Sequence, residues 1–531
     1  MGLRIFLMNN HVLDAEKTPF LSLRQELICH TLLVLIPFVL ISILVMHFTD
    51  NHFIYTLDDP YIHLTLAKNI WHGFYGINIG EVSAPSSSIL WPFLLSPFSI
   101  FGSYFEFVPL FINLLCLAGL VHLLLLIFKD IPIKSRVLLI FIILLSINGY
   151  GLVFTGMEHS LQIFLIVLGV YPLYKEKWCI QTSAPPNYQM IALVVLPMVR
   201  YEGLAISIPI LCYLFYKGYR LKASIGLISI LFILGLFSTF LYYQGLGLLP
   251  SSITAKYIPI VSNLKVNVRQ YIYLLLVIVA IEIILWKKDP QLALVVFFTS
   301  MLHFLFGHFG GFGRYEAYFV LFIVILAVRL LIDLDLPIFP TVFALPVICY
   351  SLFLINFLIP LASANIFYQQ VQMANIFRLL NDPVAVNDVG LISFRSHGKY
   401  ALDLYGLGST ASQKSRIAQL NRASSDWISD LMSKENVKYA FIFDQWFPYK
   451  PSSWIKVGKL KVKVMRVVTT FATVTMYAVD PIHAQKLFAA LKSYEPYINK
   501  DKVELIIYFG DEPGPVRPHL RKSELHSWTR Y

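Results

Sequence analysis

Residues 30–48 read HTLLVLIPFVLISILVMHF, an apolar run that is long enough to cross a membrane as a helix. A transmembrane helix needs about 20 such residues, and comparable runs recur along the chain as far as about residue 360. The composition agrees, because 57% of the residues are hydrophobic, only 14% are charged, and the mean hydropathy is +0.67. The sequence therefore predicts a multi-pass α-helical membrane protein.

The rest of the chain has more Lys, Asp, Asn and Ser between short apolar runs. This sequence pattern is typical of a water-soluble mixed α/β domain. We therefore expect two parts, a transmembrane domain over residues 1–360 and a soluble α/β domain over residues 361–531. The elements predicted in the second part are helices at 366–380 and 423–435, strands at 384–389 and 439–443, and β-rich sequence at 454–479.

Lys and Arg in the first part cluster in short loops between the apolar runs, which is the pattern of cytoplasmic loops. This pattern predicts about 11 spans, a cytoplasmic N-terminus and an extracytoplasmic α/β domain, in the plasma (inner) membrane. Residues 136–154 and 338–360 are each predicted to be a single span, and Arg200 to Glu202 are predicted to split the run at 190–216 into two short helices. Residues 50–105 then form a large first outer loop, in which the short segment 89–100, with Pro92 and Pro97, is predicted to be interfacial or re-entrant. The loops also explain the net charge of +11, so no nucleic-acid partner is expected.

Charged and polar residues of the first part gather on one side of the predicted membrane. Charges near the ends of spans normally line a cavity or a binding site, although loops at either face are polar anyway. The clustering favours an active-site cavity at the outer face. The residues concerned are Asp58, Asp59, His63, Glu81, Glu158, His159, Arg200, Glu202, Lys256, His308, Arg314 and Glu316.

The sharpest feature of the first outer loop is Asp58-Asp59-Pro60, followed by an amphipathic run to His72 and then Gly73. Pro at the first helical position and Gly after the last are ordinary helix boundaries, and Asp59 can serve as the N-cap. Asp58 has no such structural role, and two neighbouring carboxylates raise the pKa of one partner, which suits a general base. Two acids do not decide whether a divalent cation binds, and no residue is assigned as a metal ligand.

These acids and several later motifs resemble the GT-C superfamily of membrane glycosyltransferases, which use polyprenyl-phosphate-linked sugars. The likeness is to its arabinofuranosyltransferase-like and protein-mannosyltransferase-like members, whose signature is a pair of adjacent acids with the first one usually catalytic. Tyr201 departs from the family's Arg-Pro-Glu-Gly element, and Gly310-Gly311-Phe312-Gly313 stands where relatives have Gly-Gly-Asp-Trp, so the resemblance does not identify the donor sugar. The other matching stretches are Gly80-Glu81, Ser86 to Trp91, Thr155 to Glu158, Arg200 to Gly203, Leu249 to Ser252 with Lys256, Asn387 to Gly390 and Leu402 to Leu407.

The resemblance implies a GT-C fold and the transfer of a sugar from a polyprenyl-phosphate donor to an acceptor hydroxyl. The acceptor would be a glycan, a lipid or a protein on the extracytoplasmic side. Asp58 would be the general base that removes the hydroxyl proton. Asp59 and Glu158 would be further catalytic residues, with Glu158 orienting the acceptor or a cation.

Lys256 follows a loop that resembles the one placed near the lipid phosphate in these relatives, and with Arg200 and Arg314 it is a candidate ligand of the donor phosphate. These cations would stabilise the charge that grows on the leaving phosphate, unless they only snorkel to lipid headgroups. Aromatic side chains near the site could stack on a sugar or on the prenyl chain, but aromatic residues are also common at membrane interfaces. The substrate-binding residues that the resemblance implies are Glu81, Ser86, Ser87, Glu202 and Trp91.

Two other functions stay open at this stage. A transporter or flippase for a lipid-linked sugar would explain charges within apolar runs, but it favours midplane charges and repeat symmetry, and no repeat is visible. A non-catalytic envelope assembly protein, whose α/β domain binds a partner, is the third hypothesis. Membrane lipids are expected partners in each case, and a divalent cation is the one cofactor under consideration.

Overall fold

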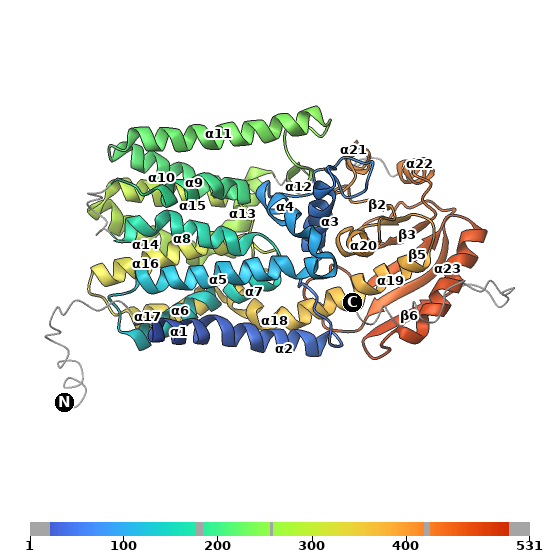
Figure 1. Cartoon of the computed structure of the whole chain (residues 1–531), viewed down its shortest axis with the longest axis horizontal. Helices are drawn as coiled ribbons and strands as arrows, with labels where there is room; N and C mark the ends of the chain where they lie inside the picture. Colours follow the sequence, from blue (N-terminus) through green and yellow to red (C-terminus); the bar gives the residue numbers. More distant parts are fainter. Residues whose placement is uncertain (1–21, 176–183, 255–258, 419–424, 509–531) are drawn as a thin grey trace.

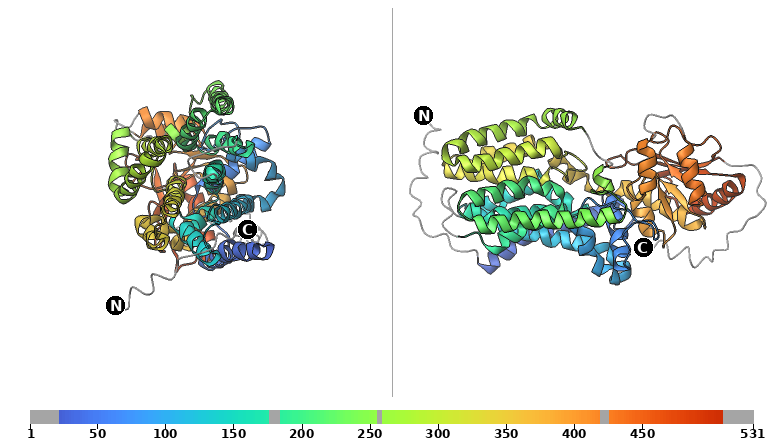
Figure 2. Two further views of the ribbon diagram at one scale, coloured as in Figure 1. Left: turned by 90° about the vertical axis from the view of Figure 1, so that its left-hand side faces the viewer. Right: turned by 90° about the horizontal axis from the view of Figure 1, so that it is seen from above.

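The structure is a computed structural model that describes residues 22–175, 184–254, 259–418 and 425–508. Its helices gather in a bundle at one end of an elongated molecule, and its strands lie at the other end (Figure 1). Figure 2 shows the same division from two further directions. A mostly helical part followed by a mixed α/β part is the fold class that the sequence predicts.

The bundle begins with one continuous helix that runs through α1 (Leu23–His30), a π-helical turn η1 (Thr31–Leu35) and α2 (Ile36–Phe48). The helices that follow in the bundle are α5 (Val108–Ile127), α6 (Ile133–Ser146), α7 (Gly149–Phe154), α8 (His159–Lys175), α9 (Asn187–Val199), α10 (Leu204–Tyr216), α11 (Arg220–Tyr243), α13 (Ile260–Gln270), α14 (Ile272–Lys288), α15 (Pro290–Phe306), α16 (Ala317–Asp333), α17 (Ile338–Ile348) and α18 (Tyr350–Ile366).

Several of these helices are long and apolar enough to cross a membrane, so the chain is a membrane protein. Large apolar side chains of α11, such as Leu231 and Phe232, are about 70% exposed, as expected for a surface that faces lipid. The count of about 11 spans and the sidedness of the membrane stay predictions. By length and composition the spanning helices are Leu23–Phe48, Leu90–Ile127, Arg220–Tyr243 and Tyr350–Leu379, with a fifth if α13 and α14, bent by 88°, form one span.

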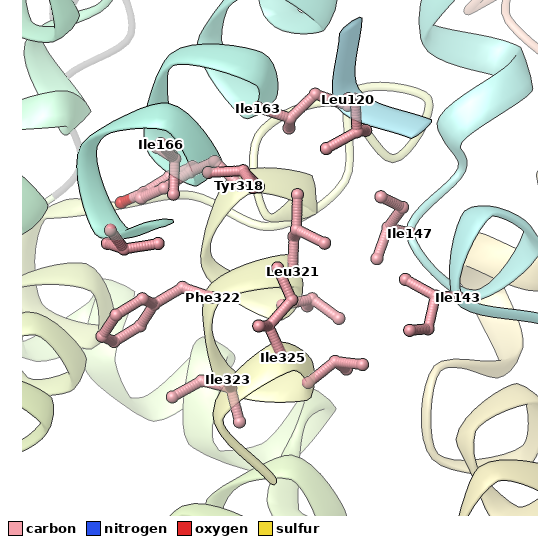
Figure 3. Packing of buried hydrophobic residues seen from close by; sticks show 14 of the residues in the cluster. Leu120, Ile143, Ile147, Ile163, Ile166, Tyr318, Leu321, Phe322, Ile323 and Ile325 are labelled. Atoms are coloured by element: carbon pink, nitrogen blue, oxygen red, sulfur yellow. The ribbon is translucent and has the colours of Figure 1, made fainter. Parts of the chain in front are cut away.

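Helix α16 lies at the centre of the bundle. Its residues are almost all buried, which is the behaviour of a helix that is apolar on every side. Leu321 and Ile325 pack in one cluster with Ile143 and Ile147 of the α6 region and with Ile163 of α8 (Figure 3). This packing fixes the start of α16, where the loop that contains Arg314 reaches the site described below.

Two apolar runs predicted as single spans are broken, and one predicted break is confirmed. The run at 190–216 divides at Arg200 into α9 and α10, as its charged residues suggest. The prediction of an unbroken span at 136–154 was wrong, because Asn148 adopts a left-handed conformation (φ 58°) and donates its side-chain amide to the carbonyl of Phe312 at 2.8 Å. The run at 338–360 is broken at Cys349, three residues after Pro346.

Residues 50–105 lie where the bundle meets the α/β domain (Figure 1). They form α3 (Asp59–Trp71), the short helix α4 (Leu90–Leu95) and most of the 3₁₀ segment η2 (Ser96–Phe107). Helix α4 and η2 both pack against α3. The segment 89–100 therefore belongs to this junction, and its position relative to a membrane stays a prediction.

The chain enters the α/β domain without a loop, because α18, the π-helical turn η4 (Phe367–Val371) and α19 (Gln372–Leu379) form one continuous helix. The helix predicted at 366–380 is thus the end of a longer one. The domain boundary near residue 360 falls inside this helix and stays a prediction.

A six-stranded sheet forms the α/β domain, with the strand order β2-β1-β3-β5-β4-β6. The first three strands are parallel, and β3, β5, β4 and β6 are antiparallel. The predicted strands at 384–389 and 439–443 and the β-rich region are confirmed, as is the described part of the helix at 423–435. The elements are β1 (Val384–Val386), α20 (Gly390–Arg395), β2 (Ala401–Asp403), α21 (Thr410–Ala418), α22 (Asp426–Lys434), β3 (Tyr439–Ile442), β4 (Ile455–Val462), β5 (Thr473–Ala478), α23 (Pro481–Tyr494) and β6 (Val503–Ile507).

Candidate active site

A polar cavity lies where the bundle, the 50–105 segment and the α/β domain meet. It is narrow, with about 20 Å³ that the centre of a water molecule can occupy, and the space between its lining atoms is about 320 Å³ when adjoining open solvent is counted. Acid, base and hydroxyl side chains line it together with a few apolar ones, and they come from segments up to 350 residues apart in the chain. The lining residues are Asp59, Ile62, His63, Pro85, Ser87, Met157, Arg200, Ser252, Arg314, Tyr315 and Leu407.

Asp59 pairs with Arg314 across the cavity. The guanidinium Nη2 of Arg314 contacts Oδ2 of Asp59 in a short ion pair and also donates to the hydroxyl of Tyr315 at 3.0 Å. Burial alone would lower the pKa of Arg314, but Tyr315 and Asp59 raise it above its ordinary value, so the side chain stays charged. Its Nε and Nη1 atoms are buried and have no hydrogen-bond partner among the described residues.

Asp58 lies next in sequence but points to the α/β domain. Its Oδ2 accepts a hydrogen bond from the backbone N–H of Gly390, and its Oδ1 accepts one from Leu391, both at 2.8 Å. These are the first two residues of α20, so Asp58 holds the start of a helix that is 332 residues away. The sequence-based view that Asp58 has no structural role was therefore wrong.

The local capping role predicted for Asp59 is not the one found. Helix α3 begins at Asp59 itself, and the N-cap position is Asp58, whose side chain makes no capping bond to α3. The two neighbouring carboxylates are thus divided between Arg314 and α20. Because each has its own partner, they do not contact the same atom.

The α/β domain brings two more acids close to this pair. Asp388 precedes α20 by two residues and accepts a hydrogen bond from the side-chain amide of Gln370 at 3.1 Å. Asp403, at the end of β2, accepts the backbone N–H groups of Tyr405 and Gly408 at 2.9 and 2.7 Å. Asp403 thereby shapes the turn that carries Leu407 into the cavity wall.

Burial raises the pKa of both Asp58 and Asp388. For Asp58 the two N–H bonds from α20 offset part of this effect, and the charges of Asp59 and Asp403 add to it. For Asp388 the carboxylates of Asp58 and Asp59 add to the effect of burial. Burial also raises the pKa of Asp403, to about 6. An acid with a pKa nearer to neutral is better suited to exchange a proton than an ordinary aspartate.

Arg200 stands at the opposite wall inside a network of carboxylates. Its Nη1 donates to Glu158 and to the hydroxyl of Ser87, both at 2.9 Å, while Nη2 and Nε bind the two oxygens of Glu202 at 2.7 and 3.1 Å. The break between α9 and α10 places the guanidinium here, because Arg200 has an extended backbone between two helices. Most of the donors of Arg200 are therefore already in use.

His63 connects this network to the loop before α4. Its Nε2 lies 3.8 Å from Oε2 of Glu158, and its Nδ1 lies 3.2 Å from the hydroxyl of Ser86. Burial lowers the pKa of His63 in spite of the nearby carboxylates, so the imidazole is neutral at ordinary pH. Glu158 is itself fully buried, and apart from His63 its Oε2 has no hydrogen-bond partner in the described part of the chain.

An apolar groove adjoins the polar cavity on the side of the bundle. It encloses about 1490 Å³ including its open side and runs between α10, α13 and α15. Four residues line both spaces, namely Ser87, Arg200, Ser252 and Tyr315. Beyond them the groove is mostly apolar, and its other lining residues are Tyr201, Glu202, Leu204, Ala205, Ile208, Ile253, Ile260, Asn263, Leu302, Leu305, Phe306, Gly307, His308 and Tyr318.

The structure brings most of the predicted site residues together, but not all of them. Glu81 binds the hydroxyls of Tyr400 and Ser409 at 2.8 and 2.5 Å, so it ties the 50–105 segment to the α/β domain and lines neither space. Trp91 is fully buried and lines neither space. Lys256 lies outside the described residues. Asp59, Ser87, Arg200 and Arg314 line the cavity, and Glu202 lines the groove. Asp58, Glu158 and Ser86 line neither space but lie next to lining residues, since Asp58 precedes Asp59, Glu158 binds Arg200 and Ser86 binds His63.

Sequence reasoning assigned no site role to several residues of this cluster. Asp388 and Asp403 lie in motifs that carried only the family resemblance, and His63 was one of the polar residues expected at the outer face but had no role of its own. Tyr315 and Ser252 had no assignment. The available signal was the Asn387-Asp388-Val389-Gly390 stretch, in which an acid stands two residues before the glycine that begins a helix.

Comparisons with known proteins give a partial and distant match. Residues 364–479 match a family model described as a domain of unknown function, DUF8728. No curated protein matches the chain in sequence. The crystal structure of the Archaeoglobus fulgidus oligosaccharyltransferase in the apo form is similar with a TM-score of 0.43 and 11% identity, over 87% of this chain and 78% of that one.

Two further structures of the oligosaccharyltransferase from this organism give similar values. AglB in complex with an inhibitory peptide and a dolichol-phosphate has a TM-score of 0.45 and 12% identity, over 84% of this chain and 74% of that one. The complex with Zn and sulfate has a TM-score of 0.43 and 12% identity, over 83% and 73%. Similarities of this size say nothing about the site, whose chemistry follows from its own residues.

Proposed function

We propose that this protein is a membrane glycosyltransferase that moves a sugar from a polyprenyl-phosphate donor to an acceptor hydroxyl. The observation that carries the proposal is that the polar cavity and the apolar groove lie side by side and share four lining residues. A substrate that fills both must have a polar head and a long apolar tail, and the residues at their junction include a buried arginine and two hydroxyls. A lipid-linked sugar has this form, with its phosphate between the two parts.

The donor would lie with its prenyl chain in the groove and its sugar in the cavity. The acceptor oxygen attacks the anomeric carbon, and the bond from that carbon to the phosphate oxygen breaks. The bonding electrons leave with the phosphate, which becomes a monoester, and the hydroxyl proton passes to a base. The products are the glycosylated acceptor and polyprenyl phosphate.

Asp58 is the proposed general base. Its raised pKa suits proton transfer near neutral pH, and its two bonds to α20 fix the carboxylate without occupying all of its lone pairs. Asp59 is less suited to this role, because its ion pair with Arg314 favours the charged form. We assign Asp59 to hold Arg314 in place, and Glu158 to orient the acceptor.

Arg314 is the proposed phosphate ligand of first choice. It is buried and charged, and two of its nitrogen atoms have no hydrogen-bond partner among the described residues. Arg200 is bound by two carboxylates, so we assign it a mainly positioning role for Ser87 and Glu158. Lys256 stays a candidate for the same phosphate on the basis of the sequence alone. Cations at this place stabilise charge that develops on the leaving group.

A divalent cation is not assigned to this cavity. Within the described ranges, no three ligand atoms from its acids and histidines lie within 4.8 Å of one another. Asp58 is committed to α20 and Asp59 to Arg314, so neither presents a free pair of oxygens. The proposed mechanism therefore uses the residues of the chain for each step.

Transfer on the extracytoplasmic side of the inner membrane follows from the predicted topology and is part of the proposal. The acceptor would be a glycan, a lipid or a protein that reaches the cavity from the side of the α/β domain. The apolar groove in the bundle suits a membrane-bound donor. The polar cavity next to the α/β domain suits an acceptor that comes from water.

The test uses the purified full chain in lipid nanodiscs with a set of polyprenyl-phosphate sugars. Release of polyprenyl phosphate together with a glycosylated acceptor supports the proposal if Asp58→Asn abolishes most of it. A second assay places the chain in liposomes with the same donors. Movement of the intact donor across the bilayer without release of polyprenyl phosphate would instead show a transporter. Neither activity with any donor would favour a non-catalytic assembly protein.

A further inference from the structure

A second group of ionisable side chains lies far from the candidate active site. Glu26 and His30 stand one helical turn apart on α1, and His122 faces them from α5. Oε1 of Glu26 is 2.5 Å from Nδ1 of His122, and the rings of His30 and His122 are stacked with centroids 6.3 Å apart. One ligand atom from each of the three residues lies within 4.8 Å of the others.

We propose that Glu26, His30 and His122 form a binding site for a divalent transition-metal ion of the zinc class. Zinc binds imidazole nitrogen and carboxylate oxygen at about 2.0–2.2 Å, which in a tetrahedral site places ligand atoms about 3.3 Å apart. Oε1 of Glu26 and Nδ1 of His122 are closer than this, at 2.5 Å, and one ligand atom of His30 lies within 4.8 Å of both residues, so the three ligands are near the spacing that a metal ion needs. Three protein ligands leave one position for water.

The ligand types select the class of metal. Two imidazoles favour zinc and its neighbours over Mg²⁺ and Ca²⁺, which prefer sets made of oxygen ligands. Arg136 does not compete for Glu26, because its guanidinium donates to the backbone carbonyl of Ile131 at 3.1 and 2.8 Å. The side chains of His122 and Glu26 are 47% and 31% exposed, so the triad lies at the surface of the bundle.

A metal ion bound at this triad would have a structural effect. Leu23 and Leu27 on the same helix are 74% and 59% exposed, so the triad lies within an apolar surface where a charged pair is poorly solvated. A bound ion would neutralise Glu26 and satisfy both imidazoles. Because the ligands come from two helices, it would also fasten the first helix of the chain to α5.

The site is separate from the proposed sugar transfer. His122 is 14 residues beyond the start of α5, or about 21 Å along the helix, and α1 lies at the end of the bundle away from the α/β domain (Figure 1). A metal there has a structural role and takes no part in the proposed chemistry. The site thus goes beyond the proposed function, and each can fail without the other.

The test is metal binding by the full chain, purified in detergent with an affinity tag that contains no histidine and stripped with a chelator. We expect about one Zn²⁺ per chain by calorimetry, with the zinc also raising the thermal unfolding temperature. His122→Ala should abolish both effects, and the milder Glu26→Gln should weaken binding at least about tenfold, in line with loss of one ligand. The matched control is His47→Ala, an exposed histidine of α2 that is not part of the triad, which should bind zinc like the wild type.

Co²⁺ gives a second readout that does not depend on stability. The wild type should show the visible absorption of four-coordinate Co²⁺, and Glu26→Gln should alter its intensity or position. The proposal is overturned if the wild type binds no zinc at micromolar concentration, or if His122→Ala binds as much zinc as the wild type. Equal loss in His47→Ala and His122→Ala would also overturn it.

Discussion

Replacing Asp58 with asparagine removes a carboxylate that serves two purposes in the structure. One oxygen accepts the N–H of Gly390 and the other accepts the N–H of Leu391, each at 2.8 Å. Asparagine can satisfy only one of these donors, because its amide nitrogen would face the other N–H. The substitution therefore removes the proposed base and also weakens the attachment of α20.

The two losses have different expected sizes. A hydrogen bond to a charged group is worth about 1.5–3 kcal/mol, and since Asp58 is only half-buried we expect a loss of about 1–3 kcal/mol in the free energy of unfolding. Removal of a general base lowers turnover by about 10² to 10⁴. At a temperature where both proteins are folded, the catalytic loss should therefore dominate.

The assay measures initial rates of sugar transfer in nanodiscs at saturating donor, with unfolding followed separately by tryptophan fluorescence. Glu106→Gln is the matched control. Glu106 binds Arg395 at the other end of α20, with 3.1 Å between Oε1 and Nη2, and it takes no part in the acid cluster. We expect this control to lower stability by a similar amount and to keep turnover within about threefold of wild type, since no base is lost.

Two results would refute this reasoning. If Asp58→Asn retains more than about a tenth of wild-type turnover, Asp58 is not the base, because the loss is smaller than a base provides. If Glu106→Gln loses as much turnover as Asp58→Asn, the effect comes from the docking of α20 and not from proton transfer. Asp59→Asn and Glu158→Gln would then be the next variants to measure.

Four further outcomes are expected from the same preparation. Arg314→Gln should lower kcat/KM for the donor by about 10² or more in initial-rate measurements, because it removes the buried cation proposed to bind the leaving phosphate. Unchanged kinetics would leave Arg314 as a structural partner of the acids. Gly390→Ala should impair turnover with the acid intact, since a Cβ there would lie 2.2 Å from the backbone oxygen of Asp58, and normal turnover would show that α20 does not position the base. Burial raises the pKa of Asp388, so the folded chain keeps a proton that the unfolded chain releases at lower pH. The free energy of unfolding should therefore fall as the pH rises through the raised pKa. Thermal melts between pH 5 and 9 should show a smaller fall for Asp388→Asn than for the wild type. Ile208→Trp should fill part of the groove and raise KM for long prenyl donors more than for short ones, whereas an equal effect on both would place the chain elsewhere.

The sequence was informative where local chemistry decides the structure. The apolar run at 190–216 breaks at Arg200 and Glu202, because charged side chains need polar partners. At the break Arg200 binds both Glu202 and Glu158. Short apolar runs between polar residues predicted the strands of the α/β domain. The collection of acids and arginines at one end of the bundle also followed from charge placement alone.

The sequence was uninformative where partners are distant. The bonds between Asp58 and α20 join residues more than 330 positions apart, and no local pattern distinguishes an acid that caps its own helix from one that holds another. The break at Asn148 has the same origin, because its side chain binds the carbonyl of Phe312 in the loop before α16. Local capping rules alone assigned Asp59 the role of N-cap and left Asp58 without one.

The α/β domain belongs to the proposed site because it supplies part of the acid cluster. Asp58 comes from the 50–105 segment, while Asp388 and the turn held by Asp403 come from the α/β domain. The hydroxyl of Ser251 bonds to the carbonyl of Leu407 at 2.7 Å and so fixes that turn at the mouth of the groove. A change that separates the domains would expose Asp58, Asp388 and Asp403 to water and return their pKa values toward ordinary ones. Docking of the α/β domain thus sets the protonation of the proposed base, so the bundle without that domain would bind a lipid donor in its groove but lack a base tuned for transfer.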